Sequence, residues 1–414
     1  MQKAIWLVVL TLFAPQLAAD PAEMTMTEAQ AVTDTPTADI DPEAGLARWI
    51  DGFRLRAMAA GITAETFEAA FAGVRFDAVV ITRDRNQNEF TKTVWDYLST
   101  AVSDDRIRLG QAALQERAAL LDEIEARYGV DRHIVVAIWG LESAYGAVRG
   151  DTPVISALAT LAYDGRRGRF FEAQLLAALL ILQNGDVDAA QMRGSWAGAM
   201  GHTQFMPTSF LDFAVDFRGN GRRDIWSDDP TDALASTAAY LAQNGWISGQ
   251  PWGVEVALPA GFDYRLANRS IIRPGGFWAG RGVTLADGSA LATQWHGAIL
   301  LPAGAAGAAF LIHANFAALE TYNTADAYVI GLGHLADRIR GGPPIVADWP
   351  LGDRALSFAE RQELQRLLTA AGFDTQGIDG LIGPNTVNAV RAFQLARGLI
   401  PDGYAPPALL EELR

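Results

Sequence analysis

The sequence predicts a mainly α-helical protein with a small β insertion and a small three-helix bundle at its C-terminal end. Amphipathic segments that end at glycine dominate residues 42–340, which is the pattern of packed helices. Residues 252–313 differ, because short alternating and apolar runs there indicate strands. After the Gly-Gly-Pro-Pro sequence at 341–344, a second helical pattern fills residues 356–414. We therefore expect two folded units joined by a linker at 341–355.

Three of the expected helices have clear ends. They cover residues 104–128, 169–184 and 232–244, and each is followed by a glycine that can take the left-handed conformation of a helix C-cap. The Asp229-Pro230 pair before the third helix suits an N-terminal cap followed by a first-turn proline.

The expected β insertion contains a strand and a hairpin. Residues 254–258 alternate between apolar and other side chains, and residues 297–313 form two apolar runs around Pro302-Ala303-Gly304. Two further helices are expected near residues 313–319 and 326–340, before the glycines and prolines end the pattern.

Composition excludes several classes of function. The chain has 414 residues, with 33 Lys and Arg against 48 Asp and Glu, and its net charge of −15 argues against a nucleic-acid partner. Because there is no cysteine, disulfides, thiolate metal sites and cysteine nucleophiles are excluded. Lys3 and Lys92 are the only lysines, and neither lies in a phosphate-binding loop or a plausible Schiff-base setting.

The N-terminal residues have the layout of a secretory signal peptide. Lys3 precedes an apolar run at 4–14, which is followed by Pro15 and a stretch of small residues that suits cleavage after Ala19. The run is shorter than the roughly 20 residues that span a bilayer, so no stable membrane anchor is expected. Residues 20–41 are rich in Thr, Ala, Asp, Glu and Pro and predict a flexible tether. We expect an exported, periplasmic protein.

Glu142 is the candidate catalytic carboxylate. It lies near the end of the apolar segment VVAIWGLESAYG at 135–146. At about 100° per residue, Val135, Ile138 and Trp139 project within roughly 60° of Glu142. Burial among apolar groups raises the pKa of a carboxyl group, which a general acid requires. The pattern alone nevertheless favours a structural role for Glu142, in a cap or an ion pair at the helix end.

No metal site or cofactor is expected. The five histidines show neither an HExxH motif nor a close pair at ligand spacing, so we interpret them as structural: His133, His202, His296, His313 and His334. Residues 216–224 resemble the start of a calcium loop. However, Arg218 stands at the third loop position and Ser227 at the twelfth, where oxygen ligands are expected, so a polar turn is predicted instead.

Five ordered blocks resemble the soluble lytic murein transglycosylases of the B type. Four of them lie at 135–146, 194–210, 216–246 and 320–339, and the fifth is the C-terminal unit. The most specific is GAMGHTQFMPTSF, because a Gly-rich turn, a Gln and a Met-Pro step in this order are hard to obtain from core packing alone. The resemblance implies that residues 42–340 form a lysozyme-like catalytic domain. It also implies cleavage of the β-1,4 bond between N-acetylmuramic acid and N-acetylglucosamine of peptidoglycan.

The resemblance also implies roles for individual residues. Glu142 would act as the single acid and base, and the C6 hydroxyl of the muramyl sugar would close onto C1 to give a 1,6-anhydro product. Ser195 and Gln204 would contact substrate, and Met200 and Phe205 would wall the site. The remaining positions would line the substrate groove: Tyr240, Tyr322, Asn323 and Tyr328. As isolated residues, Ser195 and Gln204 would be about as often part of a turn or a cap, and the other six would more often serve turns or core packing.

The C-terminal unit at 356–414 is similar to a three-helix peptidoglycan-binding module. The similarity lies in GIDGLIGPNTVNAVRAFQLARGLIPDG, in which two Asp-Gly turns flank a helix. We expect the apolar face of the first helix to pack on that of the second, through Leu364, Leu367, Leu368, Val387, Val390, Phe393 and Leu395.

These observations predict an exported enzyme whose partner is the glycan strand of peptidoglycan. A monomer is expected, without a nucleic-acid partner or a stable membrane anchor. Two alternatives remain open from the sequence. One is a hydrolysing muramidase on the same scaffold, and the other is a wall-binding scaffold protein without turnover.

Overall fold

The computed structural model describes residues 41–85 and 92–414. The predicted signal peptide, and all of the predicted tether except Asp41, lie outside the described residues. Asp41 caps the first helix, because its side chain accepts a hydrogen bond from the backbone N–H of Glu43. Within the two described ranges, no helix is long and apolar enough to cross a bilayer.

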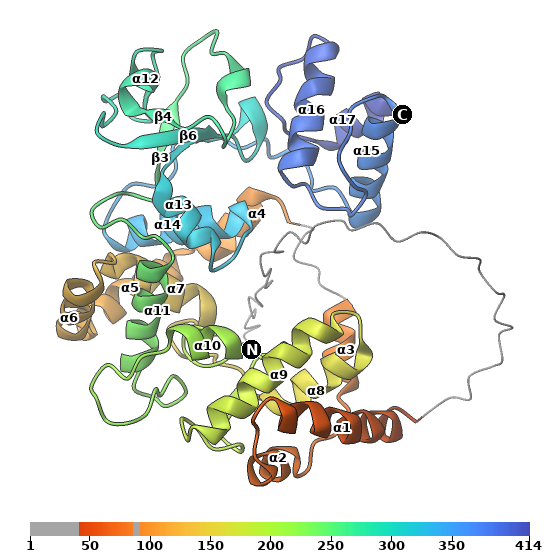
Figure 1. Cartoon of the computed structure of the whole chain (residues 1–414). Coiled ribbons are helices and arrows are strands. Elements are labelled where there is room, and N and C mark those ends of the chain that lie inside the picture. The colour runs from red at the N-terminus through yellow and green to blue at the C-terminus, as the bar shows by residue number, and fades with distance from the viewer. Residues whose placement is uncertain (1–40, 86–91) are drawn as a thin grey trace, which may run out of the picture.

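The chain is mainly helical, as predicted (Figure 1). The helices before the insertion are α1 (Pro42–Ala59), α2 (Ala64–Phe71), α3 (Ala78–Arg85), α4 (Val94–Ala101), α5 (Asp104–Glu116), α6 (Ala118–Tyr128), α7 (Arg132–Ser143), α8 (Val154–Asp164), α9 (Gly168–Gln183), α10 (Pro207–Phe213) and α11 (Thr231–Gln243). After the insertion come α13 (Ala314–Glu320) and α14 (Asp326–Ile339). Helix α7 packs against α5, α11 and α14, so its side chains meet those of elements from both halves of the chain.

The long helix predicted at 104–128 is in fact two helices. Arg117, with φ −105° and ψ 19°, ends α5 and begins α6, and Gly129 then ends α6 with φ 69°. The change of direction lets α5 pack on α7 and α14 while α6 packs on α11. The sequence has no glycine or proline at the break. The helix ends there because the packing partners of α5 and α6 differ, and this tertiary packing overrides local helix propensity.

The β insertion forms a five-stranded antiparallel sheet in the order β4-β6-β7-β3-β5. Its elements are β3 (Gly253–Ala257), β4 (Arg273–Pro274), α12 (Gly275–Ala279), β5 (Thr284–Leu285), β6 (His296–Leu300) and β7 (Ala309–Ile312). The expected hairpin is present, because Ala298 pairs with Ile312 and Leu300 with Phe310. The insertion has a small core of its own around the completely buried Trp278. A separate two-stranded pair joins β1 (Thr152–Pro153) to β2 (Arg193–Gly194).

The C-terminal unit contains α15 (Phe358–Ala370), α16 (Pro384–Ala396) and α17 (Pro407–Leu413). Leu364 and Leu368 pack with Val390 and Phe393, as predicted. The expectation for Leu395 was wrong, because its side chain is 56% exposed. At about 100° per residue, Leu395 projects roughly 140° away from Val390, so it cannot share the buried face.

The two Asp-Gly turns of this unit are built alike. The side chain of Gln365 donates to the Asp379 carboxylate and accepts from the Gly380 N–H. Gln394 makes the same two contacts with Asp402 and Gly403. Each glutamine therefore fixes one turn from a helix, Gln365 from the middle of α15 and Gln394 from the last turn of α16.

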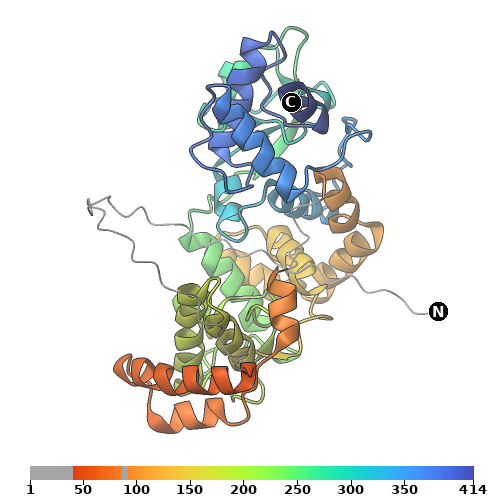
Figure 2. The same cartoon turned by 90° about the vertical axis from the view of Figure 1, so that its right-hand side faces the viewer.

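The segment at 341–355 is tied to the β insertion and to α4. The backbone N–H groups of Val346 and Ala347 donate to the carboxylate of Glu255 on β3. The Trp349 ring lies 6.1 Å from that of Trp95 on α4. Figure 2 shows the C-terminal helices next to the sheet, at the opposite end of the molecule from α1 and α2.

Candidate active site

Glu142 is in the last turn of α7 and its side chain is buried, with 5% exposure. Helix α7 begins at a cap in which the Asp131 side chain accepts from the N–H of His133. Every residue of α7 from Ile134 to Ser143 is buried, including the apolar neighbours predicted for Glu142. The carboxyl group is thus held in a largely apolar environment.

The chain leaves α7 through an unusual turn. Ala144, Tyr145 and Gly146 have φ values of 50°, 59° and 86°, so three consecutive residues are left-handed. For residues other than glycine this conformation costs about 1–2 kcal/mol each. The Tyr145 hydroxyl, which donates to the Arg106 carbonyl at 2.7 Å, compensates by fixing the turn to α5. Strain that is held in this way keeps the residues next to Glu142 in one position.

Ser143 joins the end of α7 to the Gly-rich block. Its hydroxyl donates to the His202 carbonyl at 2.5 Å and accepts from the Gly146 N–H at 3.0 Å. The hydroxyl is buried, so both contacts are made away from water. These two hydrogen bonds therefore tie the end of α7 to the Gly-rich block.

His202 is a buried connector in the same network. Its Nδ1 accepts from the Trp139 indole at 3.1 Å, and its Nε2 lies 2.7 Å from the Ser227 carbonyl. These partners fit a neutral ring protonated on Nε2. Burial lowers the pKa of His202, which agrees with the neutral form. Arg149 binds the carbonyls of Trp226 and Ser227 and so holds the same loop.

The Gly-rich block forms a tight turn against α7. The Ser195 hydroxyl accepts from the N–H groups of Ala197 and Ala199. Met200 and Phe205 exchange two backbone hydrogen bonds, which closes the turn. Both of their side chains are buried, Met200 completely, while Ser195 is half-buried. The predicted wall residues are therefore packed inside this turn.

Gln204 stands at the tip of the turn with φ 53°. Its side-chain nitrogen donates to the carbonyls of Arg149 and Gly201, at 3.0 and 2.8 Å. The amide thus holds two backbone segments in place, and the left-handed residue is fixed by its own side chain.

Tyr328 contacts Glu142 directly. Its hydroxyl donates to Oε1 of Glu142 at 2.5 Å, across 186 residues of sequence. Burial, together with the nearby charge of Glu142, raises the pKa of both Tyr322 and Tyr328 well above the ordinary value. Both tyrosines therefore stay neutral hydrogen-bond donors at physiological pH.

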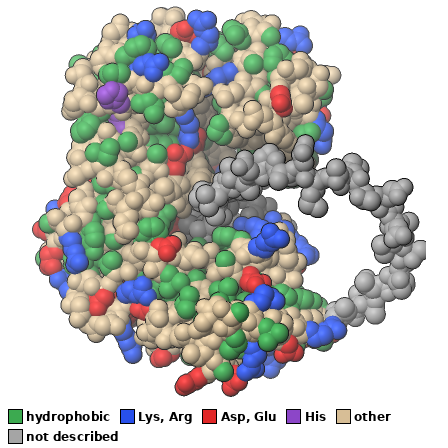
Figure 3. Space-filling view, viewed as in Figure 1, with side chains coloured by type: hydrophobic (Ala, Val, Ile, Leu, Met, Phe, Trp, Pro, Cys, Tyr) green, Lys and Arg blue, Asp and Glu red, His purple; other side chains and the backbone are tan. Residues whose placement is uncertain are grey.

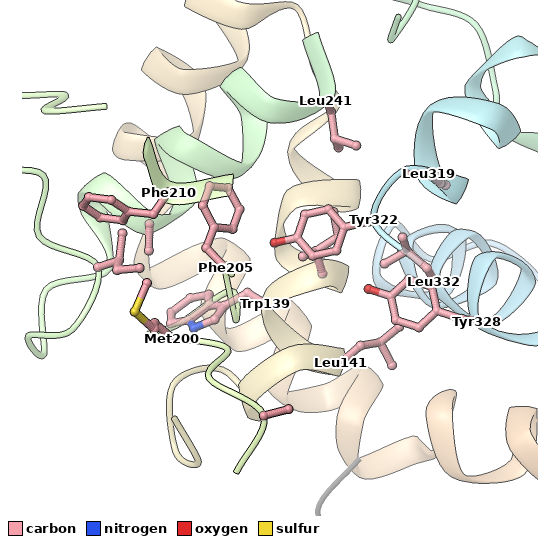
Figure 4. Packing of buried hydrophobic residues seen from close by; sticks show 14 of the residues in the cluster. Trp139, Leu141, Met200, Phe205, Phe210, Leu241, Leu319, Tyr322, Tyr328 and Leu332 are labelled. Atoms are coloured by element: carbon pink, nitrogen blue, oxygen red, sulfur yellow. The ribbon is translucent and has the colours of Figure 1, made fainter. Parts of the chain in front are cut away.

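Tyr240, Tyr322 and Phe205 form an aromatic cluster beside this pair. The ring centres of Tyr240 and Tyr322 are 5.2 Å apart, and Phe205 lies 5.8 and 6.2 Å from them. The Tyr240 hydroxyl donates to the carbonyl of Thr321, and that of Tyr322 to the carbonyl of Thr203. In Figure 4 the hydroxyls of Tyr322 and Tyr328 point toward the side on which Phe205 and Trp139 lie.

Asn323 follows Tyr322 in the connection between α13 and α14. It is buried, and its side-chain oxygen accepts from the Ala325 N–H at 3.0 Å. This contact stabilises the start of α14, which carries Tyr328. Besides Glu142 on α7, the eight other predicted site residues fall into two groups. The Gly-rich turn holds Ser195, Met200, Gln204 and Phe205, and the tyrosine side, which contacts Glu142 through Tyr328, holds Tyr240, Tyr322, Asn323 and Tyr328.

In the polar loop at 216–224, backbone N–H groups donate hydrogen bonds to the carboxylates of Asp216 and Asp224. Asp216 accepts from the N–H groups of Gly219, Asn220 and Gly221. Arg218 points to Glu123 on α6, with 2.5 Å between the charged atoms. Across the described ranges, no three His, Asp or Glu side chains are arranged to hold a metal ion.

Four residues support the site through contacts that the sequence analysis did not predict. Trp139, Ser143 and His202 link α7 to the Gly-rich block, and Arg149 braces the loop beside them. One signal was available, because His202 lies inside the most specific motif of the chain. The others could not be found without the fold, since their partners are 59 to 78 residues away in sequence.

The arrangement can perform acid–base chemistry in a dry site. A buried carboxyl group receives a hydrogen bond from a neutral tyrosine, and aromatic rings and a rigid turn keep its position fixed. The face shown in Figure 3 is hollowed between the lower part with α8 and α9 and the upper part with the C-terminal helices.

Comparison with known proteins agrees with this picture. Residues 45–337 match the family model of the transglycosylase SLT domain, and residues 359–413 match that of the putative peptidoglycan binding domain. Membrane-bound lytic murein transglycosylase B of Escherichia coli (strain K12) is 36% identical over 172 residues, which is 40% of this chain. The aligned part spans 47% of that relative, or about half its length.

Two solved structures are similar to the whole fold or to most of it. SltB3 from Pseudomonas aeruginosa, in complex with NAG-anhNAM-pentapeptide, is 54% identical, with a TM-score of 0.86. The match covers 89% of this chain and 99% of that one. The lytic transglycosylase Slt35 of Escherichia coli, in complex with bulgecin A, is 26% identical. Its TM-score is 0.60, over 72% of this chain and 93% of that one.

These matches confirm the lysozyme-like, mainly helical fold and the family that the motifs predicted. The chain belongs to the transglycosylase SLT family of B-type lytic transglycosylases and carries a C-terminal peptidoglycan-binding domain.

Proposed function

We propose that this protein is a lytic transglycosylase. It cleaves the β-1,4 bond between N-acetylmuramic acid and N-acetylglucosamine of peptidoglycan and leaves a 1,6-anhydromuramic end. The observation that carries the proposal is the buried Glu142 carboxyl group with Tyr328 on its Oε1. Family membership and the SltB3 complex with an anhydromuramic ligand support the same reaction.

In the first step, Glu142 acts as the acid. Its carboxyl proton passes to the glycosidic oxygen, and the bond between this oxygen and C1 of the muramyl sugar breaks. The electron pair stays on the leaving oxygen, and the substrate's own N-acetyl group stabilises the positive charge at C1. The hydrogen bond from Tyr328 stabilises the Glu142 carboxylate that forms.

In the second step, Glu142 acts as the base. Its carboxylate takes the proton of the muramyl C6 hydroxyl, and the C6 oxygen bonds to C1. Glu142 is protonated again and no water is consumed. The chemistry needs only groups of the chain and the substrate, and the buried setting of Glu142 keeps competing water away.

The other site residues hold the sugar or shape its surroundings. Ser195 and Gln204 form the wall beside the muramyl ring, with Met200 and Phe205 packed behind it. Tyr240 and Tyr322 offer ring faces to the sugar, because their hydroxyls are bound to backbone carbonyls. Asn323 orients the N-acetyl group in this proposal, and its buried position next to Tyr322 supports the role. A peptidoglycan substrate and the signal-peptide-like N-terminal sequence both support a periplasmic location.

Product analysis tests the proposal. Purified protein is incubated with peptidoglycan sacculi, and the released muropeptides are identified by mass spectrometry. We expect 1,6-anhydromuramic ends, and reducing muramic ends would show a hydrolysing muramidase instead.

The matched variants are Glu142→Gln and Glu172→Gln. General acid–base catalysis contributes about 10²–10⁴-fold, so Glu142→Gln should lose activity by about this factor. Glu172, which pairs with Arg56 at the surface, should tolerate the same change. Equal lysis by the parent and Glu142→Gln would refute the assignment.

A further inference from the structure

Arg269, in the β insertion, contacts the part of the chain that carries the tyrosine side of the active site. Its guanidinium lies 2.5 Å from the Glu320 carboxylate and also pairs with Asp326. Glu320 is the last residue of α13 and Asp326 is the first of α14. A single arginine therefore joins the two ends of the connection at 321–325.

This connection holds two of the proposed sugar-contacting residues, Tyr322 and Asn323. Two residues beyond Asp326, Tyr328 donates its hydrogen bond to Glu142. The spacing between the ends of α13 and α14 therefore sets where these three side chains lie. A planar guanidinium can bind two carboxylates at once with fixed geometry, which makes it suited to setting such a spacing.

The surroundings of Arg269 keep it in place. Its guanidinium carbon lies 5.1 Å from the centre of the Phe316 ring, and Phe316 is buried in α13. On the other side, the turn at 266–271 is fixed by the Asn268 side chain, which accepts from the N–H and hydroxyl of Ser270. Both carboxylates and the arginine are partly shielded from water, so the pairs are stronger than those of exposed side chains.

We propose that Arg269 is a positioning residue for the active site, through which the β insertion holds the Tyr322–Asn323 connection and the start of α14 in the arrangement that binds the sugar. This inference rests on the proposed function, since it assigns the connection a substrate. The β insertion would then affect catalysis by positioning substrate-binding residues, although it lies far from Glu142 in the sequence.

The experiment compares Arg269→Met, Arg269→Lys and Arg265→Met. Arg265 is a matched control, because it lies four residues away in the same insertion and pairs with Asp263 of that insertion. Each substitution is made in the active chain and in the Glu142→Gln background. Turnover is measured in the active chain, and the dissociation constant for a soluble GlcNAc-MurNAc tetrasaccharide is measured in the inactive one.

We expect Arg269→Met to weaken tetrasaccharide binding by about 10-fold and to lower turnover by up to about 10²-fold, because small displacements of positioning groups have effects of this size. Arg269→Lys should fall between this variant and the parent, since an ammonium group cannot bridge two carboxylates with the same geometry. Arg265→Met should match the parent in both measurements.

Binding and turnover equal to the parent in a folded Arg269→Met variant would overturn the inference, and so would a loss of thermal stability without any change in binding. If Arg269→Met does not fold, Glu320→Gln and Asp326→Asn remove one carboxylate at a time. Parent-like binding by both of these variants would overturn the inference equally. Product analysis of the parent protein tests the proposed function separately. If that function is wrong, the parent releases no anhydromuramic product.

Discussion

In the proposed reaction, the contact between Tyr328 and Glu142 explains how one carboxyl group can serve first as an acid and then as a base. A neutral tyrosine on Oε1 leaves the proton to the other oxygen and supports the carboxylate when the proton has left. Because burial keeps the pKa of Tyr328 far above neutral, the tyrosine itself does not compete for the role of base. Glu142 therefore exchanges the proton, whereas Tyr328 only donates a hydrogen bond.

Replacing Tyr328 by Phe tests this division. Hydrogen bonds to charged groups contribute about 1.5–3 kcal/mol, so Tyr328→Phe should lower kcat by about 10-fold or more, with KM little changed. Tyr322→Phe is the matched control, because that hydroxyl donates to the backbone carbonyl of Thr203. Its kcat should fall less. Steady-state kinetics on a soluble glycan measures both, and equal kcat losses would contradict a specific role for the Tyr328 hydroxyl.

Helix α7 shows how far sequence carries the site and where it stops. The apolar face of the helix and the burial of Glu142 were predictable from 3.6-residue periodicity. The left-handed run at Ala144 and Tyr145 was not, since neither residue type favours it and the turn is held by Arg106 on another helix. The same holds for Arg117, whose break between α5 and α6 depends on which helices each half meets. Local pattern thus predicts elements and faces, whereas tertiary partners set their exact ends and turns.

Helix α14 contains a carboxyl group whose ionisation opposes folding. Burial raises the pKa of Asp337 to about 6, although the indole of Trp252 donates to it. A carboxyl group with a higher pKa in the folded than in the unfolded state binds its proton more tightly when folded. Its contribution to stability is therefore present at acidic pH and is lost as pH rises from about 4 to about 6.

Asp337→Asn should remove this loss, because an amide accepts the same hydrogen bond without ionising. The stability gained by the variant over the parent should grow between pH 4 and 6 and then stay constant. Denaturant unfolding at pH 4, 5, 6 and 7 measures it. Asp263→Asn is a control of opposite sign, because Arg265 lowers the pKa of Asp263. A pH-independent difference for Asp337→Asn would show that this carboxyl group titrates normally.

The C-terminal domain is attached to the insertion through residues that also build its own turns. Asp402 binds Gln394 and Tyr404 within the domain, and its second oxygen accepts from the N–H of Ala305 in the insertion. Arg391 of α16 donates to the Ala267 carbonyl of the insertion and to the carbonyl of Asp402. Folding of the domain and its attachment are thus linked. These contacts hold the C-terminal domain against the insertion. In the proposed function, a second glycan-binding part attached in this way would raise the local concentration of substrate at the active site.

Glu255 attaches the connecting segment, since its carboxylate binds the N–H groups of Val346 and Ala347. Glu255→Ala should increase hydrogen exchange at these two amides by about 10-fold or more, because hydrogen bonds to a charged acceptor are lost. Glu255→Gln keeps one acceptor oxygen and should have a smaller effect. Exchange in α16 should stay at the parent level, which shows that the domain remains folded.

The Glu255→Ala variant should lose activity on sacculi while it retains activity on a short soluble glycan, because only the polymer engages the active site and the C-terminal domain at once. Unchanged exchange at Val346 and Ala347 in Glu255→Ala would mean that other contacts hold this segment.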